Sequence, residues 1–406
     1  MTTIRDRSVD DAAAPLRAAM VRELRDLDGI TSEPVAAAVG TVPRHLFAIG
    51  EPLEKVYAPD TPLVIKRNDD GLALSSLSAA HIQAVMLEQA GVEPGMRVLE
   101  VGSGGYNAAL LAELAGASGE VTTVDIDPDI VARARTCLDE AGYERVRVVR
   151  ADAEHGVPDG APYDRIIVTA GAFDIPPAWL DQLAGRGRIV VPLRWRGVTR
   201  SIAFDRDGDG GALASSSYRL CGFVPMQGIG AHRELVVPIE DGLFLRVDDR
   251  SRHFDTGALA AAARTRPLEA WSGAAYDLPD ELELFLLTST PRAAMLHAGR
   301  ELIDQGRFDA SAGRGVPALV RDGGFAYRIR RVNEATGGFE SGVLAHGPQA
   351  ETIAEEYCDL LRRWATGFRR RGAARIRYIP AALAAAGGAQ DLASVKPHGT
   401  VTVSWA

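Results

Sequence analysis

A glycine-rich turn follows the clearest buried-strand pattern of the chain and could bring a ligand close to the backbone. The apolar run Arg97–Val101 ends in Gly102-Ser103-Gly104-Gly105-Tyr106, and a helical pattern starts near Asn107. Glycine lets the backbone approach a ligand closely, and the first amides of a helix can donate to an anion. The turn lacks the G-x-G-x-x-G spacing that a dinucleotide pyrophosphate needs. It indicates either a ligand with a smaller anionic end, such as one carboxylate, or only a tight turn.

Two aspartates follow the next two expected strands and supply hydrogen-bond acceptors. Asp125 ends a strand, where a carboxylate can accept hydrogen bonds from both hydroxyls of a ribose. Asp152 stands after the following strand and could accept from the amino group of an adenine. Each acid alone could instead cap a helix, as we expect for Asp127 before Pro128. The turn and the two acids together predict a site for S-adenosylmethionine, which carries one carboxylate and no phosphate.

The elements that must position these residues alternate between short apolar runs and helical patterns from Leu77 to about Leu193. The expected strands are 97–101, 121–125, 146–149, 165–168 and 188–191, and the expected helices between them include 107–114 and 128–141. Such alternation predicts a parallel sheet covered by helices on both faces. Ligands bind such sheets beyond the carboxyl ends of the strands, where the glycine turn and the two aspartates stand.

The flanking segments have different patterns. Residues 1–75 begin with an expected helix, whose apolar face is Leu16, Met20, Leu24 and Leu27, and continue with a helix from Glu33 and an extended stretch at 56–65. We assign residues 1–75 to the same unit as this sheet and residues 76–230 to the core of that unit. Residues 231–406 are expected to form a separate α+β domain for substrate binding or dimerisation. Its expected elements are strands or hairpins at 232–247 and 323–332, a helix at 349–371, and strands at 374–378 and 400–405.

Composition narrows the classes of partner. The net charge of -9 disfavours nucleic acid as a partner, and no apolar run resembles a signal peptide or is long enough to span a membrane. The three cysteines are scattered without metal-type spacing. We therefore expect a cytoplasmic protein without a metal site; the oligomeric state is left open.

Several blocks of sequence resemble the protein-L-isoaspartate O-methyltransferase family. They are V-P-R-H-L-F at 42–47, Y-A-P-D-T-P-L at 57–63, P-G-M-R-V-L-E-V-G at 94–102, A-P-Y-D-R-I-I-V-T-A at 161–170 and G-F-V-P at 222–225. The resemblance implies a Rossmann-like core that uses S-adenosylmethionine. By matched position it also implies cofactor contacts at Ser76, Ser78, Gln83, Glu100, Gly102, Ser103, Gly104, Gly105, Asp125 and Asp152.

Two departures from the family pattern stand out. The glycine turn is one residue shorter than the usual G-T-G-S-G-Y, which could shift the cofactor slightly. The family block T-I-S-x-P-H is Ser76-Leu77-Ser78-Ala79-Ala80-His81 here, without its proline, which could alter the substrate loop.

The implied reaction is methyl transfer to a carboxylate of an aspartyl or isoaspartyl residue in a peptide or protein. A carboxylate is already ionised at neutral pH, so no general base is needed, and orientation and exclusion of water would supply the catalysis. The resemblance implies that the Ser78 hydroxyl orients the acceptor. Ser76 or Ser78 could also, or instead, be the N-cap of the helix that contains Ile82. His81 is expected to be packed or partly exposed rather than a base.

The added C-terminal residues favour a subgroup of the family that methylates aspartyl side chains during lanthipeptide biosynthesis, where the ester closes to a succinimide and hydrolysis gives isoaspartate. A protein-L-isoaspartate repair enzyme is the alternative, and a non-catalytic scaffold is a third possibility.

Two clusters of charge have open roles. Arg362, Arg363, Arg369, Arg370, Arg371, Arg375 and Arg377 either form a solvated helix end or bind an acidic peptide segment. Asp205-x-Asp207-x-Asp209-Gly210 begins like a calcium loop but is expected to be a hairpin turn, because its twelfth position is Ser216 rather than Glu.

Overall fold

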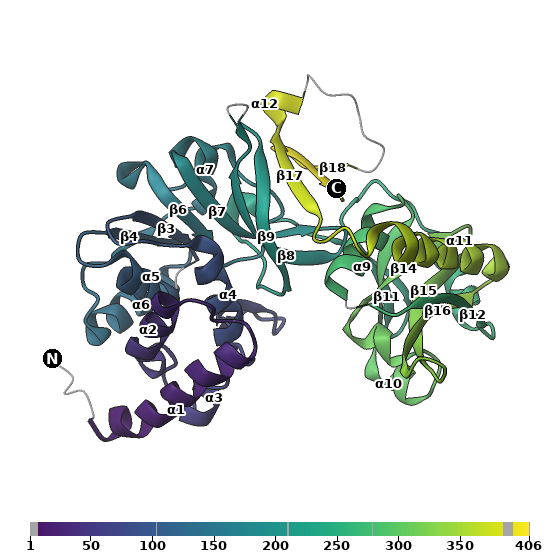
Figure 1. Ribbon diagram of the computed structural model, residues 1–406, viewed down its shortest axis with the longest axis horizontal. Helices are drawn as coiled ribbons and strands as arrows, with labels where there is room; N and C mark the ends of the chain where they lie inside the picture. Colours follow the sequence, from purple (N-terminus) through teal and green to yellow (C-terminus); the bar gives the residue numbers. More distant parts are fainter. Residues whose placement is uncertain (1–6, 103, 209–210, 278, 385–392, 406) are drawn as a thin grey trace.

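The central feature of the fold is a ten-stranded mixed sheet. The computed structural model describes residues 7–102, 104–208, 211–277, 279–384 and 393–405 (Figure 1). The strand order is β18-β19-β17-β9-β8-β7-β6-β3-β4-β5. In chain order the strands are β3 (Arg97–Val101), β4 (Glu120–Asp125), β5 (Arg147–Arg150), β6 (Tyr163–Val168), β7 (Leu183–Trp195), β8 (Val198–Arg206), β9 (Leu213–Cys221), β17 (Arg375–Pro380), β18 (Ser394–Val395) and β19 (Gly399–Ser404).

The parallel half of this sheet reverses its direction of growth at β3. β3 pairs in parallel with β4 on one side and with β6 on the other. The crossovers from β3 through β5 therefore build one way, and the chain then returns to start β6 beside β3. The carboxyl ends of β3 and β6 meet at a topological switch point, where open α/β sheets bind ligands.

Helices cover both faces of the parallel strands, which explains why those strands read as continuous apolar runs. Along β3, Val98 packs into the core under the N-terminal helices and Leu99 into the core on the opposite face. The covering helices are α1 (Arg7–Asp26), α2 (Glu33–Thr41), α3 (Leu53–Val56), α4 (Ala80–Ala90), α5 (Tyr106–Ala115), α6 (Pro128–Ala141) and α7 (Pro177–Gln182). The expected Rossmann-like α/β core is confirmed. The expected N-terminal helix is present, but Leu27 lies beyond α1 and is 52% exposed, so it is not part of the apolar face.

A separate hairpin borders the ligand edge of the sheet. β1 (Leu63–Arg67) and β2 (Ala73–Leu77) pair antiparallel, with Val64 opposite Ser76. Gln227 Nε2 donates a 3.2 Å hydrogen bond to the carbonyl of Leu74, which ties the hairpin to the segment after β9.

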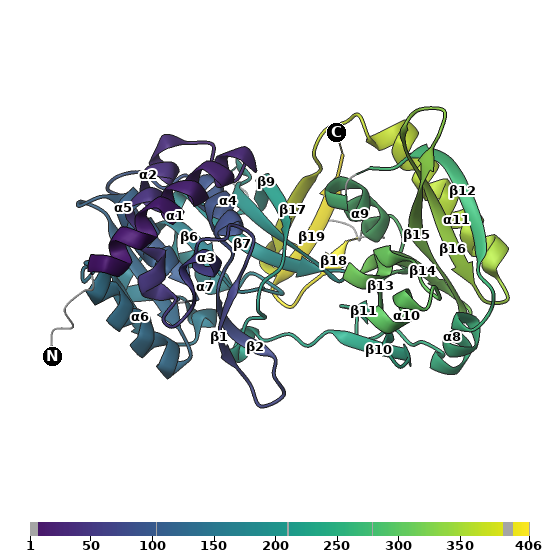
Figure 2. The same cartoon turned by 90° about the horizontal axis from the view of Figure 1, so that it is seen from below.

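A second sheet of seven strands, in the order β10-β11-β13-β14-β15-β16-β12, lies beside the first (Figure 2). Its strands are β10 (Leu235–Glu240), β11 (Leu243–Val247), β12 (Leu268–Ala275), β13 (Ala293–Ala298), β14 (Val316–Arg321), β15 (Gly324–Asn333) and β16 (Gly338–His346). Its helices are α8 (Thr256–Ala263), α9 (Pro279–Thr288), α10 (Arg300–Asp304) and α11 (Ala350–Arg363), and α12 (Ala381–Ala384) follows β17.

The chain returns to the first sheet at its end. Arg377 of β17 pairs with Ala214 of β9, and β19 pairs with β17 along its whole length. Residues 231–406 are therefore not one contiguous unit, contrary to expectation, because residues 375–404 complete the first sheet. In the described ranges, no helix combines the length and apolarity that a membrane span requires.

Candidate functional site

The glycine turn after β3 has the backbone conformation that only glycine adopts easily. Gly102 has φ +97° and Gly105 has φ +83°, and Gly105 is the N-cap of α5. A Cβ at Gly102 would lie 2.6 Å from Thr169 Oγ1, and one at Gly105 would lie 3.1 Å from the Phe47 ring. The turn is thus packed between the end of β6 and the N-terminal region, which fixes the start of α5. Ser103, one of the predicted contacts, lies outside the described residues.

A cavity opens directly above this turn at the switch point. Residues from the hairpin, the turn and the ends of β4 and β6 line it, including Ser76, Gly102, Gly104, Asp125, Thr169, Val224, Pro225 and Met226. The chain brings these predicted positions together because the carboxyl ends of parallel strands meet at one edge of the sheet. We call this space the cofactor cavity.

Glu100 is buried in the strand below the turn. Its side chain is 0% exposed, and its Oε2 accepts a 2.6 Å hydrogen bond from Thr123 Oγ1. Its Oε1 has no partner among the described residues. Burial raises the pKa of Glu100 to about 7 despite the Thr123 hydrogen bond, and the charge of Asp125 acts in the same direction. Glu100 is not among the residues that line the cofactor cavity, so its predicted contact with the cofactor is not seen in the geometry of this site.

The two predicted aspartates differ in their surroundings. Asp125 lines the cofactor cavity, and its Oδ1 accepts from the backbone amide of Asp127 at 2.9 Å. Asp152 caps a short 3-10 turn through Oδ1, while Oδ2 accepts from the Ile229 amide at 2.9 Å. The sequence pattern assigns Asp152 to an adenine, yet both of its oxygens already hold backbone amides. Its neighbour Ala153 lines the cavity.

A second cavity adjoins the first on the side of the hairpin. Ser78, His81, Asp60 and apolar residues such as Val64 and Phe223 line it. Ser76, Val224 and Pro225 line both cavities, so the two spaces adjoin at these three residues. We call the second space the acceptor cavity.

Neither serine caps the following helix. Ser76 lies within β2, and the N-cap of α4 is Ala79, without a side-chain hydrogen bond. The capping alternative is therefore wrong for both residues. Ala80, which stands where the family block has proline, is the first residue of α4, a helix position that accepts proline or other residues.

Gln83 is not a lining residue of the cofactor cavity but a partner of Arg44. The Gln83 side chain is 5% exposed, and its Oε1 accepts a 2.7 Å hydrogen bond from Arg44 Nη1. Arg44 was not predicted to have a role, although it belongs to the V-P-R-H-L-F block. An arginine in a sequence gives no sign that it will be buried, so only the packing around it could show this.

Other charged features lie away from the two cavities. Asp127 caps α6 as predicted. Asp207 lies in the turn between β8 and β9, as expected of a hairpin, and its carboxylate pairs with Arg375 and Arg377, both at 2.8 Å. Asp209 and Gly210 lie outside the described residues. Within the basic cluster, Arg362 also pairs with Asp359 and Arg369 with Asp277. These ion pairs support the interpretation as a structural surface over that of a peptide dock.

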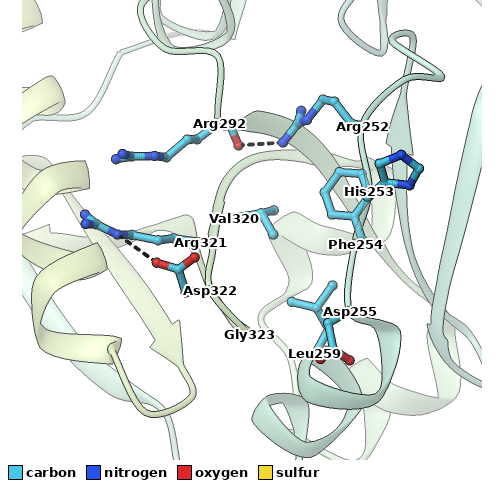
Figure 3. A pocket seen from close by; sticks show the side chains of 10 residues that line it. All are labelled: Arg252, His253, Phe254, Asp255, Leu259, Arg292, Val320, Arg321, Asp322 and Gly323. Atoms are coloured by element: carbon cyan, nitrogen blue, oxygen red, sulfur yellow. Dashed lines mark hydrogen bonds and ion pairs between the residues drawn. The ribbon is translucent and has the colours of Figure 1, made fainter.

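A further cavity lies in the second sheet region, where three arginines approach it (Figure 3). Arg292 and Arg321 both pair with Glu356, and Arg252 donates to the backbone carbonyl of Ala293 at 2.7 Å. Its cations are thus already engaged, and none of the predicted site residues lines it.

Comparison with known proteins decides the family. The model of the Protein-L-isoaspartate(D-aspartate) O-methyltransferase (PCMT) family matches residues 16–230. The chain belongs to this family. It is 39% identical over 214 residues to a protein-L-isoaspartate O-methyltransferase of Methanopyrus kandleri, covering 52% of this chain and 91% of that one. It is 41% identical over 175 residues to the Gloeobacter violaceus protein of the same name, covering 43% and 80%. As a PCMT family member it is an S-adenosylmethionine-dependent carboxyl O-methyltransferase.

A solved structure extends the PCMT comparison beyond residue 230. A protein-L-isoaspartate O-methyltransferase with 22% identity has a TM-score of 0.50 and covers 89% of this chain and 96% of its own. The second sheet region is therefore not peculiar to lanthipeptide enzymes. The extension that favoured that subgroup in the sequence does not separate it from other PCMT proteins, and these relatives give the lanthipeptide assignment no support.

Proposed function

We propose that this protein methylates the free carboxylate of isoaspartyl residues in peptides or proteins. The relatives named above carry that activity in their names, and they match the part of the chain that builds both cavities. The observation on which the proposal rests is the junction of the cofactor and acceptor cavities at Ser76, Val224 and Pro225.

The cofactor cavity fits S-adenosylmethionine. We assign Asp125 to its ribose and the backbone of Gly102 and Gly104 to its methionine end. Bound there, the cofactor supplies an electrophilic methyl group on a sulfonium. We assign Asp152 a supporting role, since it holds the segment after β9 through the Ile229 amide.

The acceptor cavity serves a substrate that needs no activation. A carboxylate is ionised at neutral pH, so the protein has only to align it and exclude water. We assign the Ser78 hydroxyl to hydrogen-bond the acceptor carboxylate. Val224 and Pro225 give the wall that both cavities share an apolar surface, which favours exclusion of water from the reacting oxygen. His81 lies half-buried on the wall and has no required part in proton transfer.

A second candidate is methylation of an ordinary aspartyl side chain in a ribosomally made, modified peptide of the lanthipeptide type. The observation in its favour is the exposed apolar rim of the acceptor cavity, where Leu72 is 56% and Leu220 is 38% exposed. Such a rim could accommodate a constrained peptide as well as an extended one.

Two peptides of identical sequence separate the candidates. One carries isoaspartate and the other aspartate at the same position, and methyl incorporation from labelled S-adenosylmethionine is followed for both. Turnover of the isoaspartyl peptide alone supports the proposal. Turnover of the aspartyl peptide alone would transfer support to the second candidate, and cofactor binding without turnover of either peptide would contradict both.

A further inference from the structure

Arg44 is a buried arginine that joins the acceptor loop to several elements around it. It belongs to the 3-10 helix η1 (Arg44–Phe47) and is 0% exposed. Its Nη2 donates a 2.7 Å hydrogen bond to the carbonyl of Ser78, and its Nε donates a 2.9 Å bond to the carbonyl of Val56. With the bond to Gln83, each of its three nitrogens holds a different segment.

The same guanidinium also reaches the cofactor side. Its carbon lies 4.9 Å from the ring centroid of Tyr106, the first residue of α5 after the glycine turn. Tyr106 is 1% exposed, so both partners are rigidly packed. One side chain therefore fixes the Ser78 loop relative to the turn that borders the cofactor cavity.

The charge of Arg44 is costly to keep where it is. None of the ion pairs among the described residues involves Arg44. Its positive charge is stabilised only by neutral groups, which are two backbone carbonyls, one side-chain amide oxygen and the face of an aromatic ring. Burial lowers its pKa below the ordinary value, with Tyr106 acting in the opposite direction. A residue needed only to fill this space could be apolar at lower cost. The arginine provides a planar fork that can fix several acceptors at once, which lysine cannot do.

We propose that Arg44 is a positioning residue for methyl transfer, acting through the Ser78 carbonyl to set the acceptor loop against the cofactor. This inference rests on the function proposed above. Misplacing a reacting group by about 1 Å can slow a reaction by about 100-fold, so the loss of this fork should affect kcat far more than cofactor affinity.

The test compares Arg44→Met with Arg133→Met. Arg133 donates a 2.9 Å hydrogen bond to the carbonyl of Phe47, and so holds the same 3-10 helix without touching Ser78. We expect Arg44→Met to lower kcat for an isoaspartyl peptide by about 10- to 100-fold, with the cofactor Kd changed less than about 3-fold. Arg44→Lys should recover part of the rate, and Arg133→Met should leave kcat near the wild-type value.

Ser78→Ala provides the check on the route of action. If Arg44 works through Ser78, Arg44→Met in the Ser78→Ala background should cost much less than it does alone, because coupled residues are not additive. Equal costs in the two backgrounds, or an unchanged kcat in folded Arg44→Met, would overturn the inference. Should Arg44→Met not fold, Gln83→Leu removes one of the three acceptors and is expected to lower kcat in the same direction.

Hydrogen exchange separates this inference from the proposed function. Arg44→Met should speed amide exchange of residues 76–83 more than Arg133→Met does, whether or not an isoaspartyl peptide is turned over. If the wild-type protein methylates no isoaspartyl peptide but the exchange difference is present, only the proposed function fails. If exchange in this segment is unchanged, the inference fails.

Discussion

At the scale of single residues, Ser78 is held in position by a hydrogen bond to its backbone carbonyl rather than through its side chain. Its carbonyl accepts from Arg44, and the helix that follows is capped at Ala79. Its hydroxyl is therefore not used for capping that helix. This is the arrangement expected of a group that is to meet a substrate.

Replacing Ser78 by alanine tests that role. The variant loses one hydrogen bond to a charged acceptor, about 1.5–3 kcal/mol, so kcat should fall by about 10- to 100-fold. Binding of S-adenosylhomocysteine, measured by calorimetry, should not change. Threonine at the same position keeps the hydroxyl and should retain more activity than alanine. Wild-type kcat in Ser78→Ala would remove the serine from the catalytic site.

Glu100 is a buried acid whose ionisation opposes the stability of the fold. Burial raises its pKa from 4.5 to about 7, so the folded state binds the proton more tightly than the unfolded chain does. Its contribution to stability is fully present below the unfolded value and is lost as the pH rises through about 7.

Glu100→Gln should reverse that loss. Glutamine cannot ionise, so the variant should not lose this stability as the pH rises. The free energy of unfolding of the variant minus that of the wild type should therefore increase by about 2 kcal/mol between about pH 5 and about pH 8. Urea denaturation of the apo protein at the two pH values measures this. Parallel pH dependence in both proteins would show that Glu100 does not titrate in this range.

At the scale of elements, the conformation of the glycine turn depends on Gly102 and Gly105. Gly102 and Gly105 have positive φ, and no atom of the described residues lies within 4 Å of the place that a Cβ at Gly104 would take. The turn thus needs glycine at 102 and 105 for conformation and space, whereas a methyl group at 104 has room.

Gly105→Ala and Gly104→Ala form a matched pair. Alanine at 105 would adopt a strained φ and press against the Phe47 ring, so we expect about 1–3 kcal/mol of destabilisation. Alanine at 104 should change the midpoint of thermal unfolding little. Differential scanning calorimetry compares them, and equal midpoints would mean that the turn tolerates a side chain at its last glycine.

The sequence predicts this half of the molecule well because its strands are buried on both faces. The run 97–101 and the helix 128–141 match β3 and α6, and the alternation gives the switch point. It predicts less where long-range packing decides. Asp152 and Gln83 were assigned to the cofactor by position, yet their side chains hold Ile229 and Arg44. No local pattern reveals such partners, which lie far away along the chain.

At the scale of the whole molecule, the pairing of β17 with β9 makes the C-terminal strands part of the methyltransferase sheet. Lys396 Nζ donates to the Arg194 carbonyl, and His398 lies 3.0 Å from Glu154, two residues after Asp152. The end of the chain therefore packs against the segment that borders the cofactor cavity. Sequence patterns could not foresee this return, because short strands carry no information on which sheet they join.

The second sheet has its own sensitivity to acid. His346 is 1% exposed, stacks against Phe308 and Phe325, and burial lowers its pKa to about 4. Because the folded state resists protonation, the contribution of His346 is full above the unfolded pKa of 6.5 and is lost as the pH falls from there towards 4.

His346→Phe should flatten that dependence. On going from about pH 7 to pH 5, wild-type protein should lose on the order of 1–2 kcal/mol of unfolding free energy through this residue, and the variant should not. Denaturant titrations followed by tryptophan fluorescence supply the comparison. The same acid sensitivity in the variant would place its origin at other groups.

The proposed methyl transfer requires that the two cavities meet so that a substrate carboxylate beside Ser78 faces a cofactor held at Asp125. A crystal structure with S-adenosylhomocysteine and an isoaspartyl peptide bound together would show whether they do. We expect the cofactor product at the Gly102–Asp125 edge and the free carboxylate within hydrogen-bond distance of Ser78 Oγ. A peptide carboxylate bound at the Arg252 cavity, with the acceptor cavity closed by side chains, would contradict this arrangement.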